Sequence, residues 1–488
     1  MSTITFEDSK HLGHLGLVAD MIHQLRIVEK IDERIPVRFD KGAKTTHGQR
    51  VKAMILNGLG FVDMRLYLFP EFLKNKAAEL LFEENFDPEL YNDDALGRTL
   101  DALSKYGVNK LYTEIAAEIG LENNLVGTSA HLDTTTLQLY GTYETHQDSE
   151  HPTPAHGYSK SGRHDLKQMI LMLVTTGASR FPLAMEPLSG NASDQKTLPQ
   201  AAEHLSNFCK DLSSGHAQDL LYVGDAAFYA NARQLHALRW LSRVPGTGKA
   251  ARDMLSRPSA SCQWQPVEEG YWQHVQEVTP RKGERKERWA LVFSEQGKKR
   301  ELATLNKKIE KEHTEQKKIW KQLSNQVFAC EKDAKKALEK TQASQKLRYH
   351  QIVAQITPLV GYAQKGRPAA TAARTIKGYQ IEAVLQEDAQ HLATEREKMG
   401  RFILATNDLD RERLPDAHLL CEYKQQSGVE RGFRFIKDTT FQVDSVYLKR
   451  NDRISALQMV MTLCLMVYGY GEYQVRKSLA AKEETLPN

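Results

Sequence analysis

The amino-acid sequence predicts a mixed α/β fold in which a sheet domain is interrupted by a long insertion. Helical periodicity fills the first part of the chain, apolar strands alternate with helices after residue 126, and a basic segment separates two sets of strands. The 488 residues suffice for about two to four domains. We expect a helical N-terminal domain at 1–125 and a sheet domain in two parts at 126–245 and 401–475. Between these two parts we expect an insertion domain with a basic helical arm at 246–400, and after them a tail at 476–488.

Composition is typical of a globular protein, with 41% apolar and 26% charged residues. The net charge of +4 is too small to indicate a nucleic-acid-binding protein, so any basic surface must come from local clusters. The five cysteines form no C-x-x-C pair, which argues against a zinc knuckle or a disulfide framework and favours a reducing cytoplasm. The first residues lack a signal-peptide pattern, and we expect no membrane partner.

The first 125 residues are predicted to be mainly helical. Apolar residues recur at helical spacing in four segments, namely 18–35, 51–61, 76–86 and 91–107. The segment from Lys41 to Lys52 holds four basic residues and no acid, as a lead-in to a helix-turn-helix would. We expect a DNA-binding domain here, with a plain helical bundle as the alternative.

After residue 126 the pattern changes to a mixed sheet. Strands are predicted at 127–141, 167–176, 181–188, 219–228 and 400–408, and helices at 198–212, 229–238, 411–437 and 454–468. The stretch from Ile454 to Gly471 carries no charge. It contains serine, glutamine, threonine and two glycines, so we interpret it as a core helix rather than a membrane span.

The insertion begins with strands at 269–278 and 288–294 and continues into a basic segment. Residues 298–357 contain no glycine or proline, and residues 298–346 hold 14 Lys/Arg against 7 acids. This predicts a long helix or a helical hairpin, and a weak heptad seam runs along it at Trp320, Leu323, Val327, Cys330, Ala334, Ala337, Thr341 and Ser344. Two interpretations remain open, a solvated arm and an arm that contacts the DNA backbone.

Three acidic residues stand out by their placement. Asp133 lies inside an apolar strand, where a carboxylate is costly to bury unless it binds something. Asp225 ends the most apolar strand, where α/β sheets tend to place functional groups. Glu430 lies on the predicted helix 411–437. Each has an ordinary alternative, as a turn aspartate, a helix cap or a surface glutamate.

Helix geometry strengthens the functional interpretation of Glu430. Tyr423, Gln426, Glu430 and Lys437 are spaced by 3, 4 and 7 residues and fall on one stripe about 60° wide, a face that suits a metal ion and a phosphate. A solvated stripe is the alternative. Three carboxylates from two strands and one helix suit two Mg²⁺ ions about 4 Å apart. There is no H-E-x-x-H, no phosphate-binding G-x-x-x-x-G-K-[ST] loop and no G-x-S-x-G elbow to support other chemistry.

Taken in order, these segments resemble DDE transposases of bacterial insertion sequences, in the cut-and-paste branch with a long insertion before the glutamate. That branch carries a Tyr, Arg, Glu, Lys signature, matched here by the stripe, with Gln426 in place of the arginine. The other matching stretches are HLDTTTLQLYG, GYSKSGRHDLKQ, SGNASD, YVGDAAF, WLSRVP and VYLKRNDRISALQMVMTLCLMVYGY. Together they cover residues 5–475.

The resemblance implies an RNase H-like core that uses two Mg²⁺ or Mn²⁺ ions to cleave DNA at the element's terminal repeats and to join the freed 3′-hydroxyl to target DNA. It also implies a dimer, and in some relatives a DNA hairpin. Asp133, Asp225 and Glu430 would be the metal ligands, with Asp194 as the alternative second aspartate. The residues expected to hold phosphate or DNA are Tyr423, Gln426, Lys437, Lys160 and Arg163, with Trp264, Trp272 or Trp289 to stack on a flipped base.

Two other functions remain open at this stage. One is a catalytically inactive or domesticated DNA-binding protein, which the three filled acidic positions disfavour. The other is an RNase H-like nuclease without strand transfer. The helical first domain and the basic insertion offer more DNA-holding surface than such a nuclease needs.

Overall fold

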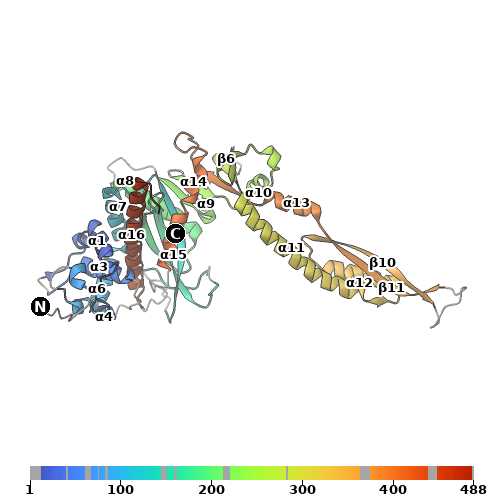
Figure 1. The fold of residues 1–488 in the computed structure, drawn as a ribbon, viewed down its shortest axis with the longest axis horizontal. Helices are drawn as coiled ribbons and strands as arrows, with labels where there is room; N and C mark the ends of the chain where they lie inside the picture. Colours follow the sequence, from blue (N-terminus) through green and yellow to red (C-terminus); the bar gives the residue numbers. More distant parts are fainter. Residues whose placement is uncertain are drawn as a thin grey trace, which may run out of the picture. The chain divides into compact units, whose positions relative to one another are not determined.

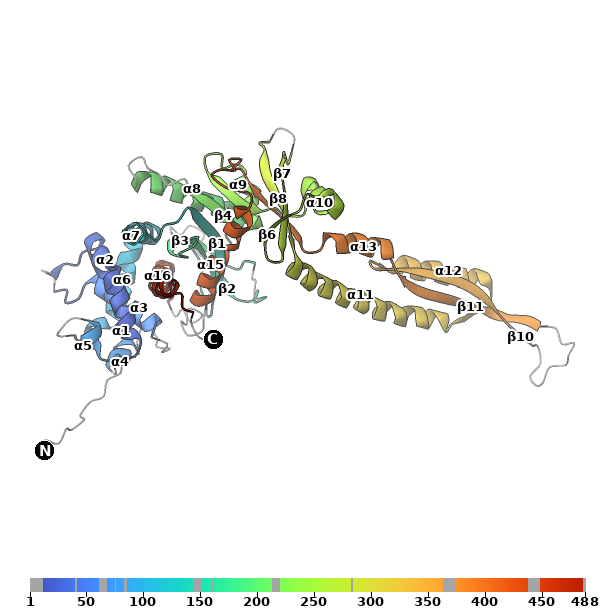
Figure 2. The same cartoon turned by 45° about the horizontal axis from the view of Figure 1, so that its top comes forward.

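The computed structural model places the chain in two compact units. Unit 1 comprises residues 1–244, 281–288 and 404–488, and unit 2 comprises 245–280 and 289–403. The structure describes residues 12–39, 42–60, 68–74, 76–82, 86–143, 151–158, 162–212, 220–281, 284–362, 374–437 and 448–485. Figures 1 and 2 label many of the elements named below.

The N-terminal region is helical, as predicted. Its elements are α1 (Leu15–Gln24), α2 (Ile27–Arg34), α3 (His47–Gly58), α4 (Phe69–Lys74), α5 (Ala78–Leu81), the 3₁₀ turn η3 (Pro88–Tyr91), α6 (Asp93–Tyr106) and α7 (Val108–Glu122). The Thr46 hydroxyl and the Gln49 side chain form a capping box that fixes the start of α3. Asn92 caps α6 by accepting from the Ala95 amide.

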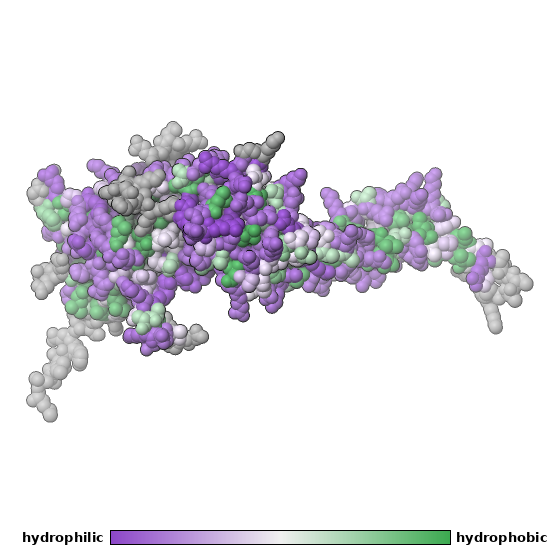
Figure 3. Space-filling model, turned by 90° about the horizontal axis from the view of Figure 1, so that it is seen from above, coloured by the Kyte–Doolittle hydropathy of each residue, from purple (hydrophilic) through white to green (hydrophobic). Residues whose placement is uncertain are grey.

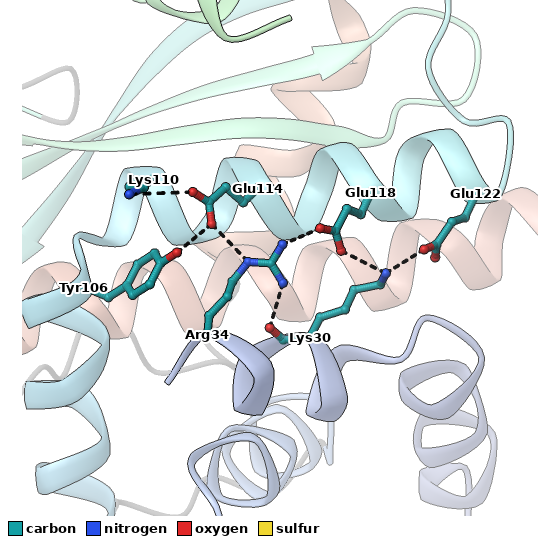
Figure 4. A network of polar contacts seen from close by, with 7 residues as sticks. All are labelled: Lys30, Arg34, Tyr106, Lys110, Glu114, Glu118 and Glu122. Atoms are coloured by element: carbon teal, nitrogen blue, oxygen red, sulfur yellow. Dashed lines mark hydrogen bonds and ion pairs between the residues drawn. The ribbon is translucent and has the colours of Figure 1, made fainter. Parts of the chain in front are cut away.

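A polar network fastens α2 to α7 (Figure 4). The buried Lys30 ammonium lies 3.1 Å from Glu118 and 2.8 Å from Glu122. Arg34 pairs with Glu114 at 3.0 Å and also with Glu118. Because the lysine is desolvated, the network stabilises this helix pair only while its carboxylates stay charged.

The sheet of unit 1 is mixed, which confirms the predicted fold class. Its strands lie in the order β3-β2-β1-β4-β5-β12. Strand β2 is antiparallel to β1 and β3, β4 is parallel to β1 and β5, and β12 is antiparallel to β5. The bounds are β1 (Ser129–Leu139), β2 (Lys167–Thr176), β3 (Pro182–Ser189), β4 (Leu221–Gly224), β5 (Arg239–Arg243) and β12 (Arg401–Thr406).

Five helices accompany this sheet, and two predictions about them were wrong. The helix expected at 229–238 runs instead from Ala226 to Ala232, because Asp225 caps it three residues earlier. The helix expected at 411–437 is two helices, interrupted at Gln425 and Gln426. The five are α8 (Asp194–Leu212), α9 (Ala226–Ala232), α14 (His418–Lys424), α15 (Ser427–Ile436) and α16 (Asn451–Lys482).

Helix α16 forms the centre of unit 1, as the core-helix prediction required. It contacts α1, α3, α6 and α7, and one apolar core joins it to the sheet (Figure 2). Length and composition alone would let α16 cross a membrane, but 78% of its most apolar window is buried inside the protein. The charge-free stretch from Ile454 to Gly471 within α16 therefore reflects its burial in the core.

Unit 2 contains a strand layer and an elongated arm. The layer holds α10 (Lys249–Leu255), the 3₁₀ turn η4 (Ser259–Ser261), β6 (Gln265–Glu268), β7 (Tyr271–Val278) and β8 (Glu287–Ser294). The arm, residues 295–399, holds α11 (Glu295–Ser324), β9 (Val327–Phe328), α12 (Glu331–Ser344), β10 (His350–Tyr362), β11 (Arg374–Glu387) and α13 (Ala389–Lys398). Figure 3 shows hydrophobic residues among hydrophilic ones on its surface.

The arm corrects the heptad prediction. The expected seam breaks after Ser324, and β10 replaces helix from His350 onward. Trp320 and Leu323 of α11 and Ala334 of α12 are buried in one cluster with Ile381 of β11. The seam thus marks the apolar side of a helical hairpin that covers the sheet β10-β11-β9.

The arm leaves and re-enters the strand layer at one place. The Ser294 amide donates to the Gly400 carbonyl at 2.8 Å. Gly400 has a φ of +75°, and a Cβ there would lie 2.5 Å from the Ser294 carbonyl oxygen. Glycine is therefore required where the two ends of the arm meet.

Candidate active site

Asp133 and Asp225 lie level with each other on neighbouring parallel strands. The register of β1 and β4 pairs Ala130 with Tyr222 and His131 with Val223. Because the strands are parallel, the same register continued by two residues places Asp133 beside Asp225. Because parallel neighbours are separated by about 4.8 Å, one ion could contact both carboxylates.

Each aspartate is held by a backbone amide. Asp225 is the N-cap of α9, and its Oδ1 accepts from the Ala227 amide at 2.8 Å and from the Phe228 amide at 3.4 Å. The Asp133 Oδ1 accepts from the Thr134 amide at 2.7 Å. Both side chains are half-buried, so they are oriented while remaining accessible.

Helix α15 brings Glu430 to the same face of the sheet. Asp133 pairs with Leu173 across β1 and β2, and directly paired residues of antiparallel strands project to one face. A Cβ on Gly432 of α15 would lie 3.2 Å from the Leu173 side chain. The helix therefore packs over the Asp133 face, and Glu430 is exposed at its first turn.

The charges of all three acids act on the half-buried Tyr423. Burial raises the pKa of the Tyr423 hydroxyl, Arg243 opposes this increase, and Asp225, Glu430 and Asp133 each add to it. The charges of these three acids therefore all act on the Tyr423 hydroxyl. The raised pKa keeps Tyr423 protonated at neutral pH and able to donate a hydrogen bond.

Arg243 is a site residue that the sequence did not single out. It ends β5, one strand beyond Asp225, and its charge acts on Tyr423. In the sequence, the stretch WLSRVP contributes only to the family resemblance. A signal was nevertheless present, because an arginine at the end of a buried strand next to an aspartate-bearing strand occupies the functional edge of the sheet.

Gln426 is buried behind the site and 8% exposed. Its Nε2 donates to the Leu132 carbonyl at 2.8 Å, which ties the start of α15 to the strand that carries Asp133. His131, fully buried on the Asp133 face, contacts Ser129 through Nε2 at 3.2 Å. Burial lowers the pKa of His131 to about 4, and the neighbouring Gln426 amide opposes this shift. In this arrangement the Gln426 amide faces protein rather than a phosphate.

Replacing Gln426 with alanine should destabilise the fold by about 1–3 kcal/mol, because the buried Leu132 carbonyl would lose its partner. Urea unfolding of the variant measures this loss. Ser427→Ala, at the exposed neighbouring position, is the control and should change stability by less than about 0.5 kcal/mol. Equal stability of the two variants would show that Gln426 does not tie α15 to β1.

The remaining predicted residues lie in different places. Lys437 is exposed at the C-cap of α15. Arg163 forms a bidentate pair with Asp165, whose pKa this pairing lowers to about 2. Asp194 accepts from Thr134, which projects to the opposite face of β1 from Asp133, so it is apart from the other acids. Lys160 lies outside the described residues.

The three tryptophans of unit 2 differ in exposure. Trp289 is buried in β8, as expected for a core tryptophan. Trp264 and Trp272 are half-buried and flank Phe293, with centroid distances of 6.1 and 5.8 Å. Their rings are therefore the accessible aromatic surface of this group.

The donor set fits divalent cations. Carboxylate oxygens are hard ligands of the kind Mg²⁺ and Mn²⁺ prefer. Among the described residues, no three Asp, Glu, His or Cys side chains are close enough in this arrangement to hold one ion. Glu430 is exposed on α15, so its side chain has room to turn toward the two aspartates.

The strands and the acids together define a class of enzyme. Within β3-β2-β1-β4-β5 only β2 is antiparallel, which is the order of RNase H-like cores, and the carboxylates lie on β1, after β4 and on a following helix. This arrangement defines a phosphoryl-transfer enzyme that acts on nucleic acid.

Residues 131–467 match the family model described as Transposase DDE domain, and the chain therefore belongs to the DDE transposases, metal-dependent enzymes that cleave and transfer DNA. Residues 7–117 match a domain of unknown function, DUF4277. No curated protein matches the sequence. The chain is similar to the solved piggyBac transposase synaptic complex with hairpin DNA, with 10% identity, a TM-score of 0.38, and coverage of 97% of this chain and 77% of that chain.

Proposed function

We propose that this transposase binds the terminal repeats of an insertion sequence and cleaves them at a two-metal site formed by Asp133, Asp225 and Glu430. The observation that supports the proposal is the register of β1 and β4, which sets Asp133 beside Asp225, with α15 packed over the same face of the sheet. When bound, two Mg²⁺ or Mn²⁺ ions would activate the attacking oxygen and stabilise the leaving oxygen.

The protein's own residues supply positioning. Asp225 is oriented by the first turn of α9, and Asp133 by the Thr134 amide. The protonated Tyr423 hydroxyl can donate to a phosphate oxygen, and Lys437 adds a positive charge at the other end of α15. Gln426 positions α15 against β1 in this proposal and replaces the phosphate contact expected of an arginine.

The partners in this proposal are terminal-repeat and target DNA, with two transposase copies holding two ends. Lys160 and Arg163 would contact flanking DNA, for which Arg163 must exchange Asp165 for a phosphate. Trp264 or Trp272 would stack on a flipped base if a hairpin forms. The expected compartment is the bacterial cytoplasm, on the nucleoid.

Cleavage of a labelled duplex carrying the element's end tests the proposal. We expect Mg²⁺-dependent nicking at the end, suppressed by a chelator, followed by joining to target DNA. Binding without cleavage in Mg²⁺ or Mn²⁺ would favour a non-cleaving DNA-binding protein. Cleavage without joining would favour a nuclease.

Excising the arm should weaken DNA binding without unfolding the rest of the chain. Because Ser294 and Gly400 are hydrogen-bonded neighbours, a short glycine linker can replace residues 295–399. Binding affinity should fall, and its salt dependence should weaken, since the basic helices would no longer release counterions. Anisotropy titrations at several salt concentrations measure both quantities.

The matched control removes only 298–346. That deletion takes away α12 and most of α11 and uncovers Ile381, which these helices bury, so this variant should aggregate. Native-like DNA affinity and salt dependence after the full excision would mean that the arm does not contact DNA.

A further inference from the structure

Three arginines from three separate elements of unit 1 share one carboxylate oxygen. Arg180 follows β2, Arg431 lies on α15 and Arg476 lies on α16. Their nitrogens are 3.4, 4.0 and 3.4 Å from the Glu472 Oε1. One glutamate therefore serves three guanidinium groups, which leaves this arginine cluster with a net charge of +2.

The pairing in the arginine cluster is loose. The pair of Arg163 with Asp165 shows the usual bidentate geometry, with contacts of 2.8 and 2.7 Å. No contact in the arginine cluster is that short, and the Arg476 Nε is buried without a hydrogen bond. The N–H donors of these three guanidinium groups therefore make few and long hydrogen bonds within the cluster.

The arginines also repel one another. Burial lowers the pKa of Arg180, Arg431 and Arg476 lower it further, and Glu472 only partly compensates. Arg431 is 59% exposed, so the cluster is open to solvent on one side. A second anion at this position would relieve the repulsion and give the guanidinium groups further acceptors.

The arginine cluster lies next to the proposed metal ligand Glu430 on α15. The exposed residues at the start of α15 include Glu430 and Arg431, and Arg434 is exposed one turn later without an acidic partner among the described residues. At about 100° per residue, Glu430, Arg434 and Arg431 follow one another around the helix. A Cβ on Gly428 would lie 3.0 Å from Arg180, which places this arginine against the same helix.

We propose that Arg180, Arg431 and Arg476 form a phosphate-binding site that holds the DNA backbone next to the scissile phosphate, with Glu472 as the internal anion that keeps the three arginines together. The ligand class is the phosphodiester backbone of duplex DNA. Arginine is suited to it because its planar fork matches phosphate oxygens. The inference rests on the proposed function and adds a DNA contact to the same site.

A purely structural ion cluster predicts the opposite response to replacement of Glu472. If the cluster only joined α15 to α16, Glu472→Gln would lower stability and leave DNA affinity unchanged or reduced. In a phosphate site, the same substitution removes a competing anion. DNA affinity should then rise several-fold, with a steeper salt dependence.

The experiment measures binding of a labelled duplex carrying the element's end, without divalent metal, from about 50 to 200 mM salt. Arg431→Gln/Arg476→Gln should weaken binding by roughly tenfold and lower the slope of log affinity against log salt by about 1 for each phosphate that is no longer bound. Arg431→Lys/Arg476→Lys should retain most of the slope, because lysine also displaces a counterion. Thermal unfolding of every variant separates binding from folding.

Lys477→Gln is the control, since this exposed lysine follows Arg476 on α16 and has no ion-pair partner among the described residues. Its effect should be smaller than that of either arginine. An arginine pair variant that binds like Lys477→Gln, or a Glu472→Gln variant that binds DNA more weakly, overturns the phosphate site. Failure of the proposed function gives a different result, in which the native chain shows these binding differences but never cleaves.

Discussion

Asp225→Asn should abolish DNA cleavage while leaving the fold and DNA binding intact. Asparagine caps a helix as well as aspartate does, so the bonds to the Ala227 and Phe228 amides can persist. It lacks the negative charge that a divalent ion requires. We expect activity to fall on the order of 10³-fold or more, because residues that act as one catalytic unit fail together. Single-turnover cleavage of the labelled end measures it.

Asp225→Ala provides the contrast, since it removes the cap as well as the charge. It should lose the same activity and in addition about 1 kcal/mol of stability. Glu430→Gln, at an exposed position outside any cap, should lose activity with unchanged stability. Cleavage by Asp225→Asn at a near-native rate would reduce Asp225 to a structural cap and refute the proposed metal site.

The largest stability effect is expected at Asp408. Its side chain is 0% exposed and lies 2.7 Å from Arg239 and 2.9 Å from Arg413. Asp408→Asn should cost about 3 kcal/mol, because Arg239 would be left buried without its charge partner. The melting temperature should fall by roughly 10 °C. Glu412→Gln, exposed in the same turn, is the control and should have little effect.

The Asp408 contribution also has a defined pH dependence. Burial raises its pKa, but hydrogen bonds from Arg413 and Arg239 outweigh this and lower the pKa below its ordinary value. A carboxyl with a lowered folded pKa stabilises the fold above its unfolded pKa of about 3.9, and this stabilisation is lost as the pH falls through the folded value. Between neutral pH and strong acid, the stability difference between wild type and Asp408→Asn should therefore shrink. A constant difference would contradict the assignment.

Local sequence was sufficient for most strands of the core, although β5 (Arg239–Arg243) was not predicted. The run from Lys167 to Thr176 was predicted with its observed bounds, because its short length and its β-branched residues favour a buried strand over a helix. Asp133 and Asp225 were placed correctly on and after strands for the same reason. Their side-by-side register follows from the pairing of β1 with β4, which no local pattern specifies.

The helix breaks were not predictable from periodicity. The turn after Ser324 contains neither glycine nor proline, and the interruption at Gln425 has only the weak signal of Ser427-Gly428 just beyond it, so both sequences are compatible with continuous helix. Tertiary contacts decide both. Gln426 bonds to Leu132, and Trp320 packs on Ile381, so long-range partners outweigh local propensity.

The arginine cluster had no sequence signal. Arg180 and Glu472 are 292 residues apart and meet only because α16 packs beside α15 and β3, the strand that follows Arg180. Arg431 was close to a predicted site residue, but one exposed arginine on a helix is ordinary. Only the fold shows that three such residues share one acid.

The meeting of Ser294 and Gly400 also has a kinetic consequence for folding. Strand β12 must pair with β5, and the intervening chain includes the whole arm. Closing a loop costs entropy that grows with the logarithm of its length, about 0.6 kcal/mol for each doubling. If the arm folds first on its own local contacts, its two ends are already joined, and the effective loop between β5 and β12 becomes much shorter. The long insertion would then add little to the entropy of pairing β5 with β12, and its excision with a short linker should leave the refolding rate of unit 1 nearly unchanged.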